Sequence, residues 1–215
     1  MHYFLVDCWS SLTREIELNG FSAVRAVHPR DLEDLPRCPA CELPVWPRRT
    51  LFPFAIEFTG RRVGDIAFHL GSTAVVSSRF MSAWSNSNLT GLLFSASPLE
   101  AKFLFSDSAC RVGAEFFAVD PEPEFCPLSE SAGATYEEPP SCETCGTGVV
   151  DSLDRVEFLE SHRPSTDFFL PSSLPGWFAV SERALGFISD QGFLNFRFVR
   201  GFSSRSGSEK TLDYA

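Results

Sequence analysis

The chain has 215 residues, of which 44% are hydrophobic and 21% charged, a composition that excludes an intrinsically disordered protein. No apolar run of about 18 residues, the length that crosses a bilayer, occurs in it, so we expect no membrane partner. The formal net charge of −10 at pH 7 disfavours nucleic-acid binding, which requires a basic surface.

The N-terminal residues, Met1 to Asp7, lack the basic region, long apolar stretch and cleavage site of a secretory signal peptide. We therefore expect a cytoplasmic protein that opens with a short strand at Tyr3-Phe4-Leu5. In a reducing compartment, seven cysteines do not form a disulfide framework. Metal binding is the better explanation for the cysteines that are clustered.

Two Cys-x-x-Cys pairs lie 104 residues apart in the chain. The first is Cys38 with Cys41, and the second is Cys142 with Cys145. Two thiolates on one tight turn can reach the same tetrahedral zinc ion, and a second pair closes a four-sulfur site. The four cysteines are thus the predicted ligands of a structural Zn2+, whereas Cys8, Cys110 and Cys126 lack this spacing. Thiol-redox chemistry and unmetallated cysteines are the alternatives.

The same spacing of 104 residues relates residues 76–94 to residues 180–198, with five identities in nineteen positions. The pattern predicts an α+β fold made of two diverged strand-helix-strand halves, a pseudo-duplication joined by a zinc-ribbon-like site of two CxxC knuckles. We expect residues 1–104 and 105–202 to be the halves of one compact body. Residues 203–215 are polar and low in complexity, and we expect them to be a mobile tail.

In the first half, the sequence predicts a strand that ends at Val76 and a short helix that begins after Ser77. The Ser77 hydroxyl can accept a hydrogen bond from an amide of the first helical turn. Met81 and Trp84 lie three residues apart, on the face that we expect to be buried. Asn88 is expected to end the helix, because asparagine tolerates the left-handed conformation.

The second half predicts the same elements, preceded by an irregular segment over residues 121–141, which contains five prolines. A strand that ends at Val180 leads to Ser181 and a helix that buries Leu185 and Ile188. Gly192 is expected to end that helix. The alternation of apolar and polar residues over 194–198 predicts a terminal strand.

These motifs, in this order, resemble the double-CXXCG motif immunity proteins, which are linked to swarming-inhibition toxins of social bacteria. The resemblance covers about residues 1–202. The segments that carry it are Cys38-Pro39-Ala40-Cys41, Gly64-Asp65-Ile66-Ala67-Phe68, Val75-Val76-Ser77-Ser78-Arg79, Cys142-Glu143-Thr144-Cys145-Gly146, Phe178-Ala179-Val180-Ser181-Glu182-Arg183 and Phe193-Leu194-Asn195-Phe196-Arg197-Phe198. Glu42 stands where the motif has a glycine, and the chain is short between the first knuckle and Gly64.

The resemblance implies an immunity protein that binds and neutralises a cognate toxin domain by stoichiometric inhibition. Between Asp107 and Glu160 the chain has 13 acidic residues and two arginines. If the toxin is a nuclease with a basic face, this acidic segment can cover that face. The expected partner-binding residues are Asp120, Glu122, Glu124, Glu137, Glu138, Asp151, Asp154 and Glu157.

Two other classes of function remain as alternatives. One is a zinc-dependent or thiol-redox enzyme of unknown substrate. Four thiolates close the coordination sphere of zinc, whereas a catalytic site keeps an open position, so we expect no enzyme and no catalytic residues. The other is a zinc-ribbon module that binds nucleic acid, which the negative charge disfavours.

Overall fold

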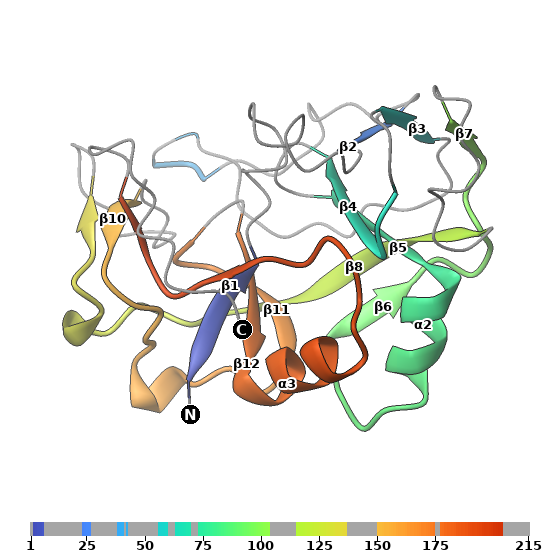
Figure 1. Cartoon of the computed structure of the whole chain (residues 1–215). Helices are drawn as coiled ribbons and strands as arrows, with labels where there is room; N and C mark the ends of the chain where they lie inside the picture. Colours follow the sequence, from blue (N-terminus) through green and yellow to red (C-terminus); the bar gives the residue numbers. More distant parts are fainter. Residues whose placement is uncertain are drawn as a thin grey trace.

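A mixed β-sheet with helices on one face organises the described part of the chain, and the fold is α+β and dominated by sheets (Figure 1). The computed structural model describes residues 2–6, 23–26, 38–40, 42, 56–59, 63–69, 73–103, 115–136, 150–174 and 177–203. Among these, eight strands form one sheet in the order β13-β1-β12-β11-β8-β5-β4, with β6 pairing to β8. They are β1 (Tyr3–Val6), β4 (Ile66–His69), β5 (Thr73–Ser77), β6 (Leu92–Phe94), β8 (Phe116–Glu124), β11 (Phe168–Pro171), β12 (Phe178–Ser181) and β13 (Phe198–Val199).

Two antiparallel strand pairs within this sheet are placed alike relative to the helix that follows, with the paired residues 10 apart in the first and 12 apart in the second. In the β4–β5 pair, Ile66 lies opposite Val76. In the β11–β12 pair, Phe168 lies opposite Val180. Each pair leads directly into a helix, α2 (Ser78–Ser85) after β5 and α3 (Glu182–Asp190) after β12.

On their other edge, β5 and β12 each pair with a strand from the opposite half of the sequence. β8 lies next to β5, with Phe117 opposite Val76. β1 lies next to β12, with Phe4 opposite Val180. β6 pairs with the other edge of β8, and β13 with the other edge of β1. The two groups of strands join where β11 runs parallel to β8.

A serine hydroxyl group caps the N-terminus of each helix, as predicted. The Ser77 Oγ accepts a hydrogen bond from the Phe80 amide at 3.2 Å, and the Ser181 Oγ accepts one from the Ala184 amide at 3.2 Å. The prediction for the helix ends is correct only for Gly192, which is left-handed with φ 59°. The first helix ends before Asn88, since the Asn86 side chain donates to the Ser82 carbonyl at 2.9 Å and closes the last turn.

Each helix buries residues spaced four apart rather than three. In α2, Phe80 and Trp84 are buried and their rings stack with centroids 5.6 Å apart. Met81 is only partly buried at the edge of the core. In α3, Ala184 and Ile188 are buried, while Leu185 packs at the edge. A spacing of four follows the helical repeat more closely on these short helices.

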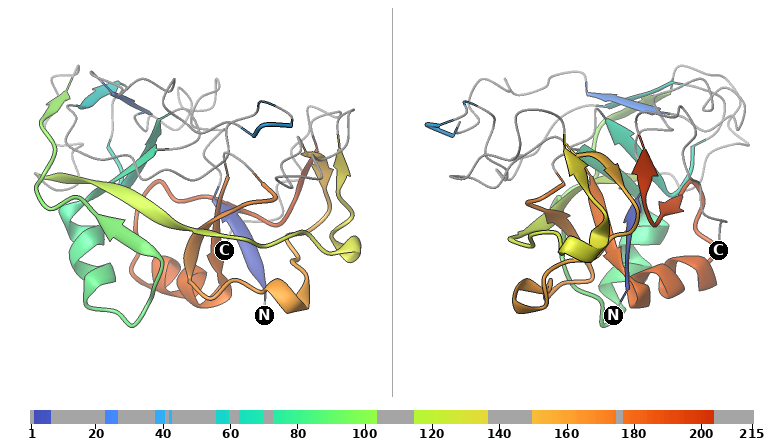
Figure 2. Two further views of the ribbon diagram at one scale, coloured as in Figure 1. Left: turned by 180° about the vertical axis from the view of Figure 1, so that it is seen from behind. Right: turned by 90° about the vertical axis from the view of Figure 1, so that its left-hand side faces the viewer.

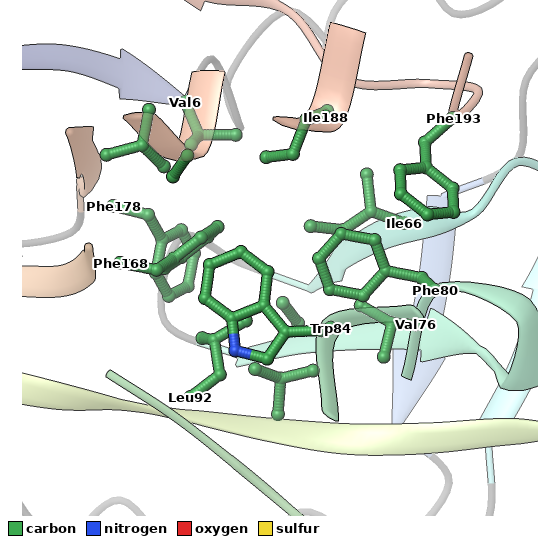
Figure 3. Close-up of a cluster of buried hydrophobic side chains, with 14 of the residues drawn as sticks. Val6, Ile66, Val76, Phe80, Trp84, Leu92, Phe168, Phe178, Ile188 and Phe193 are labelled. Atoms are coloured by element: carbon green, nitrogen blue, oxygen red, sulfur yellow. The ribbon is translucent and has the colours of Figure 1, made fainter. Parts of the chain in front are cut away.

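Side chains from both halves of the sequence meet in one core between the helices and the sheet (Figure 3). Trp84 of α2 contacts Phe168 of β11 edge to face, with ring centroids 6.1 Å apart. Phe80 contacts Phe193, which follows α3, at 5.0 Å. The members labelled in Figure 3 are Val6, Ile66, Val76, Phe80, Trp84, Leu92, Phe168, Phe178, Ile188 and Phe193. Burial of this apolar surface holds the two halves together.

Two three-stranded sheets cover the other face of the large sheet, away from the helices (Figure 2). In one of them, Phe58 packs against Phe116 of β8. In the other, Leu153 belongs to the same buried cluster as Leu5 of β1. Their strands are β2 (Ala23–Ala26), β3 (Ile56–Thr59), β7 (Ala101–Phe103), β9 (Thr135–Tyr136), β10 (Val150–Leu153) and β14 (Phe202–Ser203). Two short 3-10 helices, η3 (Glu130–Ala132) and η4 (Glu160–His162), complete the described elements.

Two segments differ from the sequence-based prediction. The predicted terminal strand over 194–198 is a turn at Leu194 and Asn195, and only its last residue, Phe198, belongs to β13. The Leu194 amide and carbonyl both bond to Asp65, at 2.8 and 2.9 Å, so they are not available to a strand. The segment from Pro121 was predicted to be irregular, but β8 continues to Glu124. A strand can pass through proline where the missing amide is not needed.

Candidate functional site

Cys38, the first cysteine of the first Cys-x-x-Cys pair, lies at the start of a tight turn that is described at residues 38–40 and 42. Cys38 is buried, and the Ala40 amide donates to its sulfur at 3.4 Å. The Glu42 amide donates to the Cys38 carbonyl at 2.8 Å, which closes the turn. Amide hydrogen bonds to sulfur stabilise a thiolate, so this turn fits a cysteine that binds zinc.

Glu42 holds this turn in a backbone conformation that favours glycine. Its φ is 58°, in the left-handed region, where a side chain is strained. Glycine was the residue expected at this position from the resemblance. The backbone at position 42 therefore has a conformation that glycine adopts without strain, although the residue is glutamate.

The other three predicted zinc ligands, Cys41, Cys142 and Cys145, lie outside the described residues. Within the described ranges, no three His, Cys, Asp or Glu side chains come together as a metal site. The four-cysteine site therefore stays a prediction.

The predicted acidic surface is described at six of its eight residues, since Glu137 and Glu138 lie outside the described ranges. Asp120, Glu122 and Glu124 lie on β8 and are partly exposed. Asp154 is exposed after β10, and Glu157 pairs with Arg155 at 2.8 Å. Asp151 is buried on β10, so its side chain does not contribute to a contact surface.

Backbone hydrogen bonds place the segment around Glu157 beside the one that follows β8. The Ser129 amide donates to the Glu157 carbonyl at 2.9 Å, and the Leu159 amide donates to the Pro127 carbonyl at 2.9 Å. Leu128 and Phe158 form a β-bridge between these two bonds. The residues after β8 and those from Glu157 onward therefore form one continuous surface.

Asp65, which precedes β4, makes a buried ion pair with Arg79 of α2 and is fully buried itself. The Arg79 Nε and Nη2 donate to the two carboxylate oxygens at 3.1 and 2.7 Å. The Ser77 Oγ donates to Asp65 at 2.6 Å, and the Leu194 amide donates at 2.8 Å. Because both oxygens are occupied by donors, this carboxylate is suited to a structural link and not to proton transfer.

Asp167, which precedes β11, has the same set of partners. Its carboxylate pairs with Arg183 and accepts from the Ser181 Oγ at 2.7 Å and from the Thr90 amide at 3.0 Å. Burial alone would raise the pKa of Asp167. The hydrogen bonds from Arg183, Ser181 and Thr90, together with the Arg183 charge, outweigh burial and hold the pKa below its usual value.

Each of these two carboxylates bonds to a turn that follows the helix of the other half. Asp65 bonds to Leu194, after α3, and Arg79 Nη2 donates to the Gly192 carbonyl at 3.0 Å. Asp167 bonds to Thr90, after α2, and Arg183 Nη2 donates to the Asn88 carbonyl at 3.1 Å. Sequence reasoning did not identify these links. The signal available was a Val-Ser-x-Arg segment at the start of each helix, which places a hydroxyl and a guanidinium together.

Cys126 is fully buried, and burial raises the pKa of its thiol to about 12. A thiol with this pKa stays protonated at neutral pH, so it is not a nucleophile there.

No helix in the described part of the chain is long and apolar enough to cross a membrane. In comparisons with known proteins, no family model matches the chain. No curated protein matches it either.

Proposed function

We propose that the chain is an immunity protein that binds a cognate bacterial toxin domain and neutralises it by stoichiometric inhibition, as in the double-CXXCG motif proteins that its sequence resembles. The observation that carries this proposal is that Asp120, Glu122, Glu124, Asp154 and Glu157 are all at least partly exposed, on two segments that lie side by side. Hydrogen bonds between the two segments fix their backbone, so a partner can bind there without first ordering it.

The charge of this surface suits a basic partner. Described residues 115–136 and 150–163 contain nine acidic residues and two arginines. Such a field steers a basic protein toward the surface and increases its association rate, most strongly at low salt. A toxin domain that binds nucleic acid through a basic face has the matching charge.

A growth assay tests the proposal. Cells would express a candidate toxin domain, sought first in the genes next to this chain's gene, with or without the chain, and the control would be an unrelated toxin. We expect the chain to restore growth against the candidate toxin only. If the chain is present as folded protein and growth is not restored, the proposed function is wrong.

The contribution of charge is tested by replacing Glu122, Asp154 and Glu157 together with lysine. Glu124 should be kept, because its Oε1 accepts hydrogen bonds from the Ser165 amide and from the Ser165 and Thr166 hydroxyls, at 3.0, 2.8 and 3.1 Å. The triple variant should associate with the toxin at least about tenfold more slowly at low salt. Equal association rates for the triple variant and the wild type would show that these charges do not steer binding.

We also propose that Cys38, Cys41, Cys142 and Cys145 hold one structural zinc ion. The turn at Cys38, with its amide-to-sulfur hydrogen bond, supports this ligand set. Four thiolates would add folding free energy by joining distant parts of the chain. Elemental analysis should find one zinc per chain, and Cys38→Ser should lose it whereas Cys126→Ala should retain it. Zinc absent from the wild-type protein would contradict the site.

Finally, we propose that residues 1–104 and 105–202 are diverged copies. In both β4–β5 and β11–β12, the residue after the aspartate lies opposite the valine before the helix-capping serine, which supports this. The matching environments of Asp65 and Asp167 support it too. In this proposal the first strand of each copy, β1 or β8, pairs with strands of the other copy. The exchange resembles domain swapping within one chain.

A further inference from the structure

Phe125 is the most exposed of the large hydrophobic side chains among the described residues. It follows β8 directly, and 63% of its surface is exposed. Its ring contacts the His162 ring edge to face, with centroids 5.4 Å apart. Leu159, at the start of the same short helix as His162, is 39% exposed. The three side chains are defined here as the Phe125 patch.

The backbone that presents Phe125 is fixed on both sides. Before it, Glu124 accepts three hydrogen bonds from Ser165 and Thr166. After it, Cys126 is fully buried, its amide donates to the Ser172 Oγ at 3.2 Å, and its carbonyl accepts from the Ser173 Oγ at 2.8 Å. The exposure of Phe125 is therefore imposed by the fold. An aromatic side chain has only two rotatable bonds, so on a fixed backbone it loses little entropy when a partner covers it.

Charged residues border the patch on the side of η4. The Glu160 side chain is 85% exposed and pairs with Arg163 at 3.3 Å. The Glu157 side chain is 45% exposed. An apolar centre with a polar rim is the usual arrangement of a protein interface, and aromatic residues at the centre carry much of the binding free energy.

We propose that the Phe125 patch is the centre of the surface that binds the toxin domain. The matching partner surface has an apolar pocket for the Phe125 ring, bordered by lysine or arginine side chains that compete with Arg155 and Arg163 for Glu157 and Glu160. This inference rests on the proposed immunity function. It adds that Phe125 slows dissociation of the complex, whereas the acidic residues increase the association rate.

The test compares Phe125→Ala with Leu194→Ala, using the purified toxin domain encoded next to this chain's gene as the probe. Leu194 is 38% exposed in the turn after α3, so it is a matched apolar control outside the patch. We expect Phe125→Ala to bind at least about tenfold more weakly, mainly through faster dissociation. Leu194→Ala should bind within about twofold of wild type, as expected for an apolar residue outside the interface.

Two further measurements separate the possible outcomes. Thermal unfolding should give the same midpoint for Phe125→Ala and wild type, because the side chain is exposed. The loss of affinity should be equal at low and high salt, since it reflects apolar contact and not charge. If Phe125→Ala binds as tightly as wild type, the patch is not the interface, although the immunity function stands. If the wild-type chain does not bind the toxin domain, both proposals are wrong.

Discussion

The Asp65 carboxylate accepts a hydrogen bond from the backbone amide of Leu194, a residue 129 positions further along the chain, at 2.8 Å. Asp167 makes the corresponding bond to the Thr90 amide, 77 positions earlier, at 3.0 Å. Each carboxylate also holds the serine that caps the helix of its own half. The start of each helix is thereby coupled to the turn after the other helix.

Replacing Asp65 with alanine should destabilise the protein by about 3 kcal/mol. This is the lower end of the cost of breaking a buried ion pair, because Arg79 is half-exposed and can return to water. The Ser77 hydroxyl and the Leu194 amide would also lose their acceptor. Urea unfolding measures the change, and hydrogen exchange should be faster at the Leu194 amide. Asp190→Ala, at the exposed end of α3, should change stability by less than about 0.5 kcal/mol. Equal stability of the Asp65 and Asp190 variants would contradict the coupling.

Acid should weaken the fold through Asp167. The pKa of Asp167 is lower in the folded protein than in the unfolded chain. The contribution of Asp167 to the free energy of unfolding is therefore fully present above about pH 4, the pKa of an aspartate in the unfolded chain. It is lost as the pH falls through the lower pKa that Asp167 has in the folded protein. Urea midpoints of wild type and Asp167→Asn should differ most at pH 7 and converge toward pH 2. A constant difference over this range would show that the Asp167 charge does not contribute.

Glycine at position 42 should stabilise the protein. Glu42 has φ 58°, and glycine removes the strain of a side chain in this region, at some cost in the entropy of the unfolded chain. We expect Glu42→Gly to be about 0.5–1 kcal/mol more stable than Glu42→Ala, which loses the same carboxylate but keeps the strain. Thermal unfolding of the two variants measures this. A Glu42→Ala variant as stable as Glu42→Gly would show that the turn is not strained.

The halves of the sequence should not fold separately. β1 pairs with β12 and β13, and β8 pairs with β5 and β6, so a fragment of residues 1–104 lacks the central strand of its own sheet. Expressed alone, fragments 1–104 and 105–215 should show no cooperative unfolding. Expressed together, they should associate into a folded complex. Cooperative unfolding of either fragment alone would contradict this pairing.

The sequence predicted the features that depend on neighbouring residues. Ser77 and Ser181 are helix caps, and the opening strand and the strands before both helices are present. These features arise from hydrogen bonds and side-chain periodicity within a few positions. The α+β class followed from the same patterns.

Features that depend on distant contacts were not predicted. No local pattern showed that Leu194 would bond to Asp65, so its segment was interpreted as a strand. The extension of β8 through Pro121 depends on β6, whose Leu92 lies opposite that residue, and on β11. The Phe125 patch also could not be predicted, because 22 phenylalanines give no sign of which ring is exposed.

The central claim, stoichiometric binding of a toxin, is tested most directly by calorimetric titration of the purified chain with the toxin domain encoded next to its gene. Residual toxin activity is measured at each point. We predict one chain bound per toxin domain, with toxin activity falling in proportion and reaching zero at equivalence. Heat of binding absent at concentrations of about 10 μM, where even a Kd of about 1 μM is detected, or full toxin activity in the bound complex, would contradict the account.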